Sequence, residues 1–260
     1  MNVAVLAALI ALTNGFGRVE IDTVGAHVMS YVPAGGEEVL FRTQAPRRLP
    51  DFYHGGIPVC WPWFNLQGDP GTIRHGFART LEWEVVSTKN GPSSSTATFR
   101  LRSGPESRRH FDGDFELLYT VTLADALTVD LTMRNTGARR FPVTTGFHSY
   151  FRIGELAKAG VRLPDDLVSC TPGMDGARPY GAGTYALVDG ATGRTVEIES
   201  WGNGKLVIWN VGEKPHPCFS ADEWRRYVCV EPAIIPRGEG IWLEPQATYA
   251  LGMRIRVAGK

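Results

Sequence analysis

The sequence has no excess of charge of either sign, because 27 Lys and Arg residues balance 27 Asp and Glu residues over 260 positions. Proteins that hold a nucleic-acid backbone usually carry a basic patch or stripe. Nucleic acid is therefore not an expected partner. The charged fraction of 21% is too low, and the hydrophobic fraction of 43% too high, for a disordered chain.

The chain also lacks a hydrophobic run long enough to cross a membrane. Residues 3–12 are apolar, but this stretch is about half as long as a spanning helix. No basic residue precedes it, and Thr13-Asn14-Gly15 follows directly, which is typical of a turn rather than of a signal-peptide cleavage site. We expect a buried first strand or a short lead-in here, no membrane partner, and a cytoplasmic protein.

Cysteines are few, and no two of them form a Cys-x-x-Cys pair. Buried free thiols are favoured over a disulfide framework for Cys60, Cys170, Cys218 and Cys229. The six histidines show no His-x-His or His-x-x-x-His spacing, so no metal site is expected, although a distributed His-His-Glu site stays open. Gly-x-Ser-x-Gly and the glycine-rich nucleotide-binding loops are absent too. We therefore expect neither a serine nucleophile nor a cofactor.

What the chain has in abundance is glycine, proline and two-residue alternation. Alternation is clearest in Phe115–Leu123 and Leu127–Met133, and the short turn between them predicts an antiparallel hairpin. One short helix is considered at 154–159. Composition does not change along the chain, which predicts one domain over residues 1–260, an all-β, large antiparallel β-sandwich. Further strands are predicted at 19–23, 81–85, 97–101, 196–198, 206–211, 227–230 and 249–257.

Two segments, 51–80 and 209–232, are dense in polar and aromatic groups, and we expect functional loops there. His148 follows the strand-like segment 143–147, and Glu231 ends an apolar run that starts at Val228. Taken alone, each has a structural interpretation, as a hydrogen-bonded histidine and as a carboxylate at the end of a strand. A carboxylate buried without a partner would indicate function instead, because its desolvation is costly.

Specific sequence blocks follow one another in order over nearly the whole chain. They are His54-Gly-Gly-Ile-Pro-Val-Cys-Trp-Pro-Trp-Phe64, His75-Gly-Phe-Ala-Arg79, His148-Ser-Tyr-Phe151, Val207-Ile-Trp-Asn210, and Asp222 followed by Val228-Cys-Val-Glu-Pro232. Together they resemble the aldose 1-epimerase superfamily, and most closely its glucose-6-phosphate 1-epimerase (hexose-6-phosphate mutarotase) branch. The resemblance implies a β-sandwich of the galactose-mutarotase-like type, in agreement with the alternation.

The resemblance also implies a reaction, the metal-free interconversion of α and β anomers of an aldohexose or hexose 6-phosphate through ring opening. By motif, His148 is the expected general acid and Glu231 the expected general base, about 5–7 Å apart if they flank a sugar ring. Trp61 and Phe64 are further aromatic candidates for contact with the apolar face of the sugar. For at least two of Trp61, Trp63, Phe64 and Phe77, core packing is an equally good interpretation. The implied substrate-binding residues are His75, Arg79, His54, Asp222, Phe77 and Trp63.

The chain departs from the family pattern at two places. His54 stands where the phosphomutarotase branch usually has an arginine, whose guanidinium can hold phosphate with two hydrogen bonds. The segment Ala182-Gly-Thr-Tyr185 lacks the acidic residue that usually helps to hold the sugar. Asp175 is nearby in sequence, but the sequence does not place it in the site. The alternative function is therefore a non-catalytic carbohydrate-binding or regulatory domain on the same fold.

Overall fold

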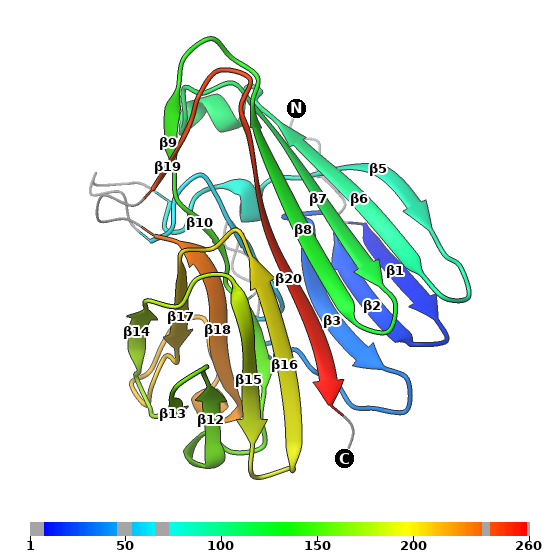
Figure 1. The fold of residues 1–260 in the computed structure, drawn as a ribbon, viewed down its shortest axis with the longest axis vertical. Helices are drawn as coiled ribbons and strands as arrows, with labels where there is room; N and C mark the ends of the chain where they lie inside the picture. Colours follow the sequence, from blue (N-terminus) through cyan, green and yellow to red (C-terminus); the bar gives the residue numbers. More distant parts are fainter. Residues whose placement is uncertain (1–7, 46–53, 66–72, 236–239, 259–260) are drawn as a thin grey trace.

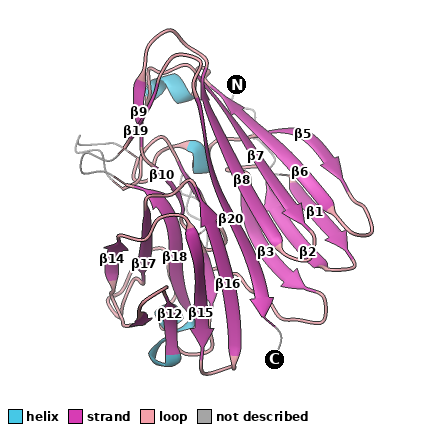
Figure 2. Ribbon diagram, viewed as in Figure 1, coloured by secondary structure: helices cyan, strands magenta, loops and turns pink. Residues whose placement is uncertain are grey.

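The computed structural model describes residues 8–45, 54–65, 73–235 and 240–258. Antiparallel strands make up most of this part of the chain, and the helical elements in it are short 3-10 turns (Figures 1 and 2). The prediction of an all-β, antiparallel fold is confirmed. The 3-10 helices are η1 (Ala78–Thr80), η2 (Ser107–Arg109), η3 (Leu156–Lys158) and η4 (Glu223–Arg226).

The largest sheet runs in the order β13-β12-β15-β16-β20-β8-β7-β6-β5. Alternation places every second residue of β7 in the core, and the β7–β8 hairpin closes with Leu123 opposite Leu127, as predicted. In Figure 1 these long strands fan out across the molecule. The bounds are β5 (Glu84–Lys89), β6 (Ser95–Arg102), β7 (Phe115–Leu123), β8 (Leu127–Asn135), β12 (Ala159–Arg162), β13 (Leu167–Ser169), β15 (Gly183–Asp189), β16 (Arg194–Trp201) and β20 (Thr248–Ala258).

The second sheet runs in the order β14-β17-β18-β10-β4, and β11 also pairs with β18. Glu231 lies on its strand β18. The bounds are β14 (Asp175–Arg178), β17 (Lys205–Trp209), β18 (Tyr227–Ile234), β10 (Thr145–Phe147), β4 (Val59–Cys60) and β11 (Tyr150–Arg152). A three-stranded sheet holds β1 (Leu9–Asn14), β2 (Gly17–Asp22) and β3 (His27–Pro33), and β9 (Phe141–Val143) pairs with β19 (Ile241–Leu243).

Strand β18 is buried along its whole length, so both of its faces are covered. Val228 and Val230 join the main core together with Leu117 and Leu131 of the larger sheet. The residues between them point the other way, because successive side chains of a strand alternate in direction. Cys229 belongs to a separate apolar cluster on that second face. The second face of β18 is therefore the place where the sheet presents side chains outside the main core.

Several local predictions need correction. Glu231 does not end a strand, since β18 continues to Ile234. The first strand is β1, in which Leu12 is buried and Leu9 is exposed, and residues 3–7 of the predicted segment lie outside the described residues. The considered helix at 154–159 is the single turn η3. No helix among the described residues is both long enough and apolar enough to span a bilayer. The single domain and the cytoplasmic location stay predictions.

Candidate active site

Strand register places His148 opposite Glu231. On one side Gly146 of β10 pairs with Ala233 of β18, and on the other side Tyr150 of β11 pairs with Cys229. His148 connects β10 to β11, and its backbone N–H donates to the carbonyl of Pro58 at 3.0 Å. The two short strands thus hold His148 directly across from the middle of β18.

The two side chains meet in a buried setting. His148 Nδ1 lies 3.4 Å from Glu231 Oε1, and the exposed fractions of the two side chains are 9% and 1%. Within the described part of the chain, neither His148 Nδ1 nor Glu231 Oε2 has a hydrogen-bond partner. Glu231 stands on β18 between Cys229 and Ala233, which belong to two different apolar clusters. Such a carboxylate is costly to bury, which marks it as a functional candidate.

Burial displaces the pKa values of this pair in opposite directions. It lowers the pKa of His148 well below its ordinary value, and the positive charge of Arg79 adds to the effect. It raises the pKa of Glu231 well above its ordinary value, and the negative charge of Asp175 adds to that effect. Both changes favour the uncharged forms, an imidazole and a carboxylic acid, because charge is poorly solvated in an apolar setting.

A second histidine completes the group. The ring of His75 lies edge-on to that of His148, with centroids 5.0 Å apart. The backbone N–H of Asn65 donates to His75 Nδ1 at 3.2 Å, which leaves the proton of the neutral ring on Nε2. Burial lowers the pKa of His75, and the positive charge of Arg79 acts in the same direction. His75 is thus a neutral hydrogen-bond donor beside the pair.

Aromatic rings fix the orientation of His148. Tyr150 stacks on it at a centroid distance of 4.8 Å, and Trp209 of β17 lies edge-on at 5.5 Å. Phe64 lies parallel to it at 6.4 Å. Tyr150 is fully buried whereas Trp209 is half-buried. Trp209 therefore offers an apolar face next to the pair.

Phe77, Trp63 and His54, which were also predicted to bind substrate, do not lie together in the structure. Phe77 is completely buried in the main core and packs on Trp61, which favours its interpretation as core packing over that of a sugar platform. Trp63 is also in that core, and its Nε1–H donates to the carbonyl of Ile73 at 2.7 Å. His54 is half-buried and lies edge-on to Phe219, with centroids 5.2 Å apart.

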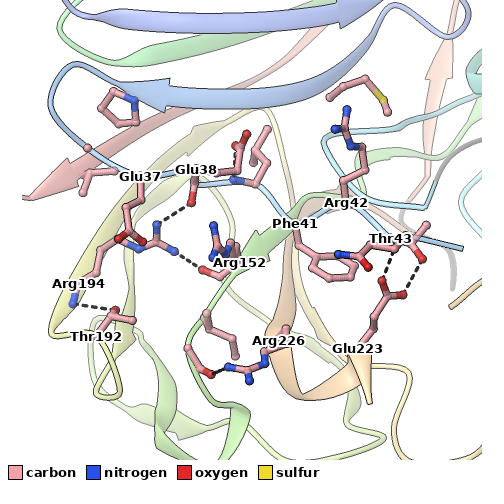
Figure 3. A pocket seen from close by; sticks show the side chains of 18 of the residues that line it. Glu37, Glu38, Phe41, Arg42, Thr43, Arg152, Thr192, Arg194, Glu223 and Arg226 are labelled. Carbon is pink, nitrogen blue, oxygen red and sulfur yellow. Dashed lines mark hydrogen bonds between the residues drawn. The ribbon is translucent and has the colours of Figure 1, made fainter. Parts of the chain in front are cut away.

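Asp222 lies in a different place from the pair. It is exposed, its carboxylate lies 3.6 Å from Arg225 Nε, and it lines a groove of 1650 Å³ to which neither His148 nor Glu231 contributes (Figure 3). The charged groups in this groove mostly hold chain segments together: Glu223 accepts from Thr43 Oγ1 at 2.6 Å, and Arg194 Nη1 donates to the carbonyl of Glu38 at 2.9 Å. We therefore leave Asp222 out of the candidate site.

Comparison with known proteins shows the family of this chain. The family model described as aldose 1-epimerase matches residues 8–172, which is more than half of the chain. The chain belongs to the aldose 1-epimerase family. The family match covers His75, Arg79 and His148, and the remaining catalytic candidate, Glu231, comes from the part of the chain beyond it.

Relatives within the aldose 1-epimerase family cover most of the chain. An Escherichia coli (strain K12) protein named "Putative glucose-6-phosphate 1-epimerase" is 28% identical over 256 residues, 89% of this chain and 84% of the relative. A Cenchrus ciliaris protein of the same name is 26% identical, over 84% and 75% of the two chains. The crystal structure of "a putative mutarotase" from Salmonella typhimurium has a TM-score of 0.90 at 24% identity, covering 98% and 91%, which shows a shared fold.

The structure adds to the candidate site a residue that sequence reasoning did not place. Asp175 of β14 pairs with Trp209 of β17, and the ring of Trp209 lies edge-on to that of His148. Burial raises the pKa of Glu231, and the negative charge of Asp175 adds to this rise. Asp175 is exposed, so it lies where the site meets solvent. Segment 175–178 reads Asp-Gly-Ala-Arg and has no hydrophobic alternation, so the sequence does not reveal its pairing with β17.

Asp175→Asn tests this electrostatic link. Removing the negative charge lowers the pKa of Glu231, so the acidic limb of the pH–rate profile moves to lower pH, with a change of less than tenfold in the plateau rate. The shift shrinks in high salt, because an exposed charge is screened. We expect no shift for Glu197→Gln, which removes an exposed carboxylate on β16. Equal profiles for Asp175→Asn and the native protein would show that Asp175 does not act on Glu231.

Proposed function

We propose that this protein interconverts the α and β anomers of an aldohexose or hexose 6-phosphate by general acid–base catalysis. Glu231 is the base and His148 the acid, and His75 and Trp209 contact the sugar. The observation that carries the proposal is the cross-strand meeting of His148 and Glu231, both buried and each with a polar atom that no described residue satisfies. Membership of the aldose 1-epimerase family supports the same chemistry.

The pair is closer than expected from groups that flank a whole sugar ring, 3.4 Å instead of about 5–7 Å. The two oxygens that exchange protons, O1 and O5 of a pyranose, are both bonded to C1. Two catalytic groups can therefore reach them from one side of the ring without enclosing it. Contacts of this kind also change when substrate binds.

The short distance lets the pair share one proton. Burial favours a carboxylic acid beside a neutral imidazole. Moving the same proton from Glu231 to His148 gives a carboxylate and an imidazolium without changing the total charge. That arrangement can take a proton from the O1 hydroxyl and deliver one to O5. The pair therefore titrates as a unit, and loss or gain of its shared proton should limit activity at high and low pH.

Ring opening then conserves every atom and proton. Glu231 removes the proton of the O1 hydroxyl, a C1–O1 double bond forms, the C1–O5 bond breaks, and His148 protonates O5. Rotation about C1–C2 exposes the other face of the aldehyde. Reversed transfers close the ring to the second anomer and restore both groups. Each group can contribute on the order of 10²–10⁴-fold.

The proposal is tested by adding the protein, in buffer with a chelator, to one pure anomer of glucose, galactose or glucose 6-phosphate. Equilibration is followed by polarimetry and by NMR exchange spectroscopy. Acceleration with at least one of these sugars is expected, and it should be lost in His148→Ala. Calorimetric binding of a sugar without any acceleration would contradict the proposal and favour the non-catalytic carbohydrate-binding function.

Preference for a phosphorylated substrate depends on His54. A permanently charged guanidinium binds phosphate more strongly than a mostly neutral imidazole. We expect His54→Arg to lower the KM for glucose 6-phosphate about tenfold, a change of about 1.4 kcal/mol. The KM for glucose should change little, and His216→Arg serves as the matched control because His216 contacts the His54 ring. An equal change for both sugars would show that His54 does not face the phosphate.

A further inference from the structure

A third side chain with affinity for metals lies beside the catalytic pair. Cys229 and Glu231 are two residues apart on β18, so their side chains share the face of the strand that looks away from the main core. His148 reaches the same face from the segment between β10 and β11. One ligand atom from each of these three residues lies within 4.8 Å of the other two. Sulfur, imidazole nitrogen and carboxylate oxygen thus converge on one point.

The spacing is close to that of a bound transition metal. With metal–ligand bonds of about 2.0–2.3 Å, the ligand atoms of a tetrahedral site lie about 3.3–3.8 Å apart. His148 Nδ1 and Glu231 Oε1 already meet this requirement at 3.4 Å. The largest separation in the group exceeds it by about 1 Å, so the three ligand atoms must move closer by that amount when a metal binds.

Burial and unsatisfied polar atoms favour the binding of a cation by His148, Cys229 and Glu231. Cys229 and Glu231 are 0% and 1% exposed, and His148 is 7% exposed. His148 Nδ1 and Glu231 Oε2, which both belong to this group, find no hydrogen-bond partner within the described residues. A cation held by the three side chains would bind the lone pair of His148 Nδ1 and neutralise the carboxylate of Glu231. The small exposed part of His148 gives a route of entry from solvent.

The geometry points to a site for one soft divalent cation, Zn²⁺ or Co²⁺, held by His148, Cys229 and Glu231, whose occupancy inhibits the enzyme. A thiolate, an imidazole and a carboxylate form a donor set that suits these ions rather than Mg²⁺ or Ca²⁺. The fourth position is left for water or a sugar hydroxyl. The inhibition, though not the binding, rests on the proposed function, because the metal occupies the atoms that would otherwise exchange protons with O1 and O5.

The binding test needs no sugar. Chelator-treated full-length protein is titrated with Co²⁺ and, separately, with Zn²⁺ by calorimetry. We expect one equivalent of metal to bind, and the Co²⁺ form to show a near-ultraviolet thiolate-to-cobalt charge-transfer band with tetrahedral visible bands. Cys229→Ser should lose the thiolate band and bind Zn²⁺ at least tenfold more weakly. Cys170→Ala, which also alters a buried cysteine, should behave like the native protein.

The inhibition test uses the anomer exchange of the native protein. Stoichiometric Zn²⁺ should abolish most of the acceleration, and EDTA should restore it. The inference would be overturned by a native Co²⁺ complex without a thiolate band. Zn²⁺ inhibition that persists unchanged in Cys229→Ser would overturn it as well. If that variant fails to fold, the Co²⁺ spectrum of the native protein alone decides. Metal binding with no anomer exchange under any condition would contradict the proposed function and leave the metal site standing.

Discussion

Glu231→Gln is expected to reduce the acceleration of anomer exchange by about 10²–10⁴-fold. Glutamine keeps the size and shape of the side chain but cannot accept the proton of the O1 hydroxyl. The loss should fall on kcat more than on KM, because an amide can still hydrogen-bond the sugar. The rates are measured by NMR exchange spectroscopy with the sugar on which the native protein is active, and Glu197→Gln serves as the exposed control.

The same variant should unfold less readily than the native protein. Between the ordinary carboxyl pKa of 4.5 and its raised value in the fold, Glu231 holds a proton that the unfolded chain has released. Native stability therefore falls as pH rises through this window, and the full penalty remains above it. Glutamine carries no such penalty, so the stability advantage of the variant grows with pH from about 4.5 upward.

Urea denaturation at several pH values measures this difference. The lowered pKa of His148 costs stability as pH falls below the ordinary histidine value of 6.5, but it does so in both proteins and largely cancels. A folded, more stable and inactive variant would separate chemistry from structure. A variant with native activity would rule out Glu231 as the base, and one less stable than the native protein at neutral pH would contradict the cost assigned to its burial.

Gly76→Ala should produce a large loss of stability, about 3–5 kcal/mol. Gly76 has a φ of +72°, which disfavours any residue with a Cβ. A Cβ built there would lie 2.0 Å from the carbonyl oxygen of Trp61 and 2.4 Å from its carbon. Both are backbone atoms of the segment that Gly76 bridges, so the chain itself must move. Because His75 precedes Gly76, activity should fall with stability.

Gly193→Ala separates backbone strain from steric overlap. Gly193 has nearly the same φ, +73°, but a Cβ there would meet nothing within 4 Å. Only the cost of the left-handed conformation remains, about 1 kcal/mol. Urea unfolding of the two variants gives the difference directly. Equal losses would show that the close approach of Gly76 to Trp61 does not exist in solution.

Local alternation was enough to predict much of the fold. Phe115–Leu123 and Leu127–Met133 form the hairpin that their pattern indicates, because one face is buried and the other is not. Alternation does not define the bounds of β18, because this strand is buried on both faces and its sequence is a plain apolar run. For that reason the predicted strand stops at Val230, whereas β18 continues to Ile234.

The site was predicted as residues but not as an arrangement. The resemblance named His148, Glu231 and His75, which the structure brings together. It could not say which way an aromatic ring points, and the positive φ values of His75 and Gly76 turn the chain so that Phe77 enters the core. Nor could it place Asp175, because the pairing of β14 with β17 joins segments that are distant in sequence. The position of Cys229 beside Glu231 was predictable from the sequence, because alternate residues of a strand share a face.

The short strands β4 and β10 also set the order in which the molecule can assemble. Thr145 Oγ1 donates to the carbonyl of Cys60, 85 residues away, and β10 joins β4 to β18. The β7–β8 hairpin, in contrast, closes over a turn of a few residues. Contacts between distant segments form more slowly than local ones. A refolding chain should therefore regain β-structure early and the His148–Glu231 arrangement late, so newly made protein can be largely folded before its candidate site is assembled.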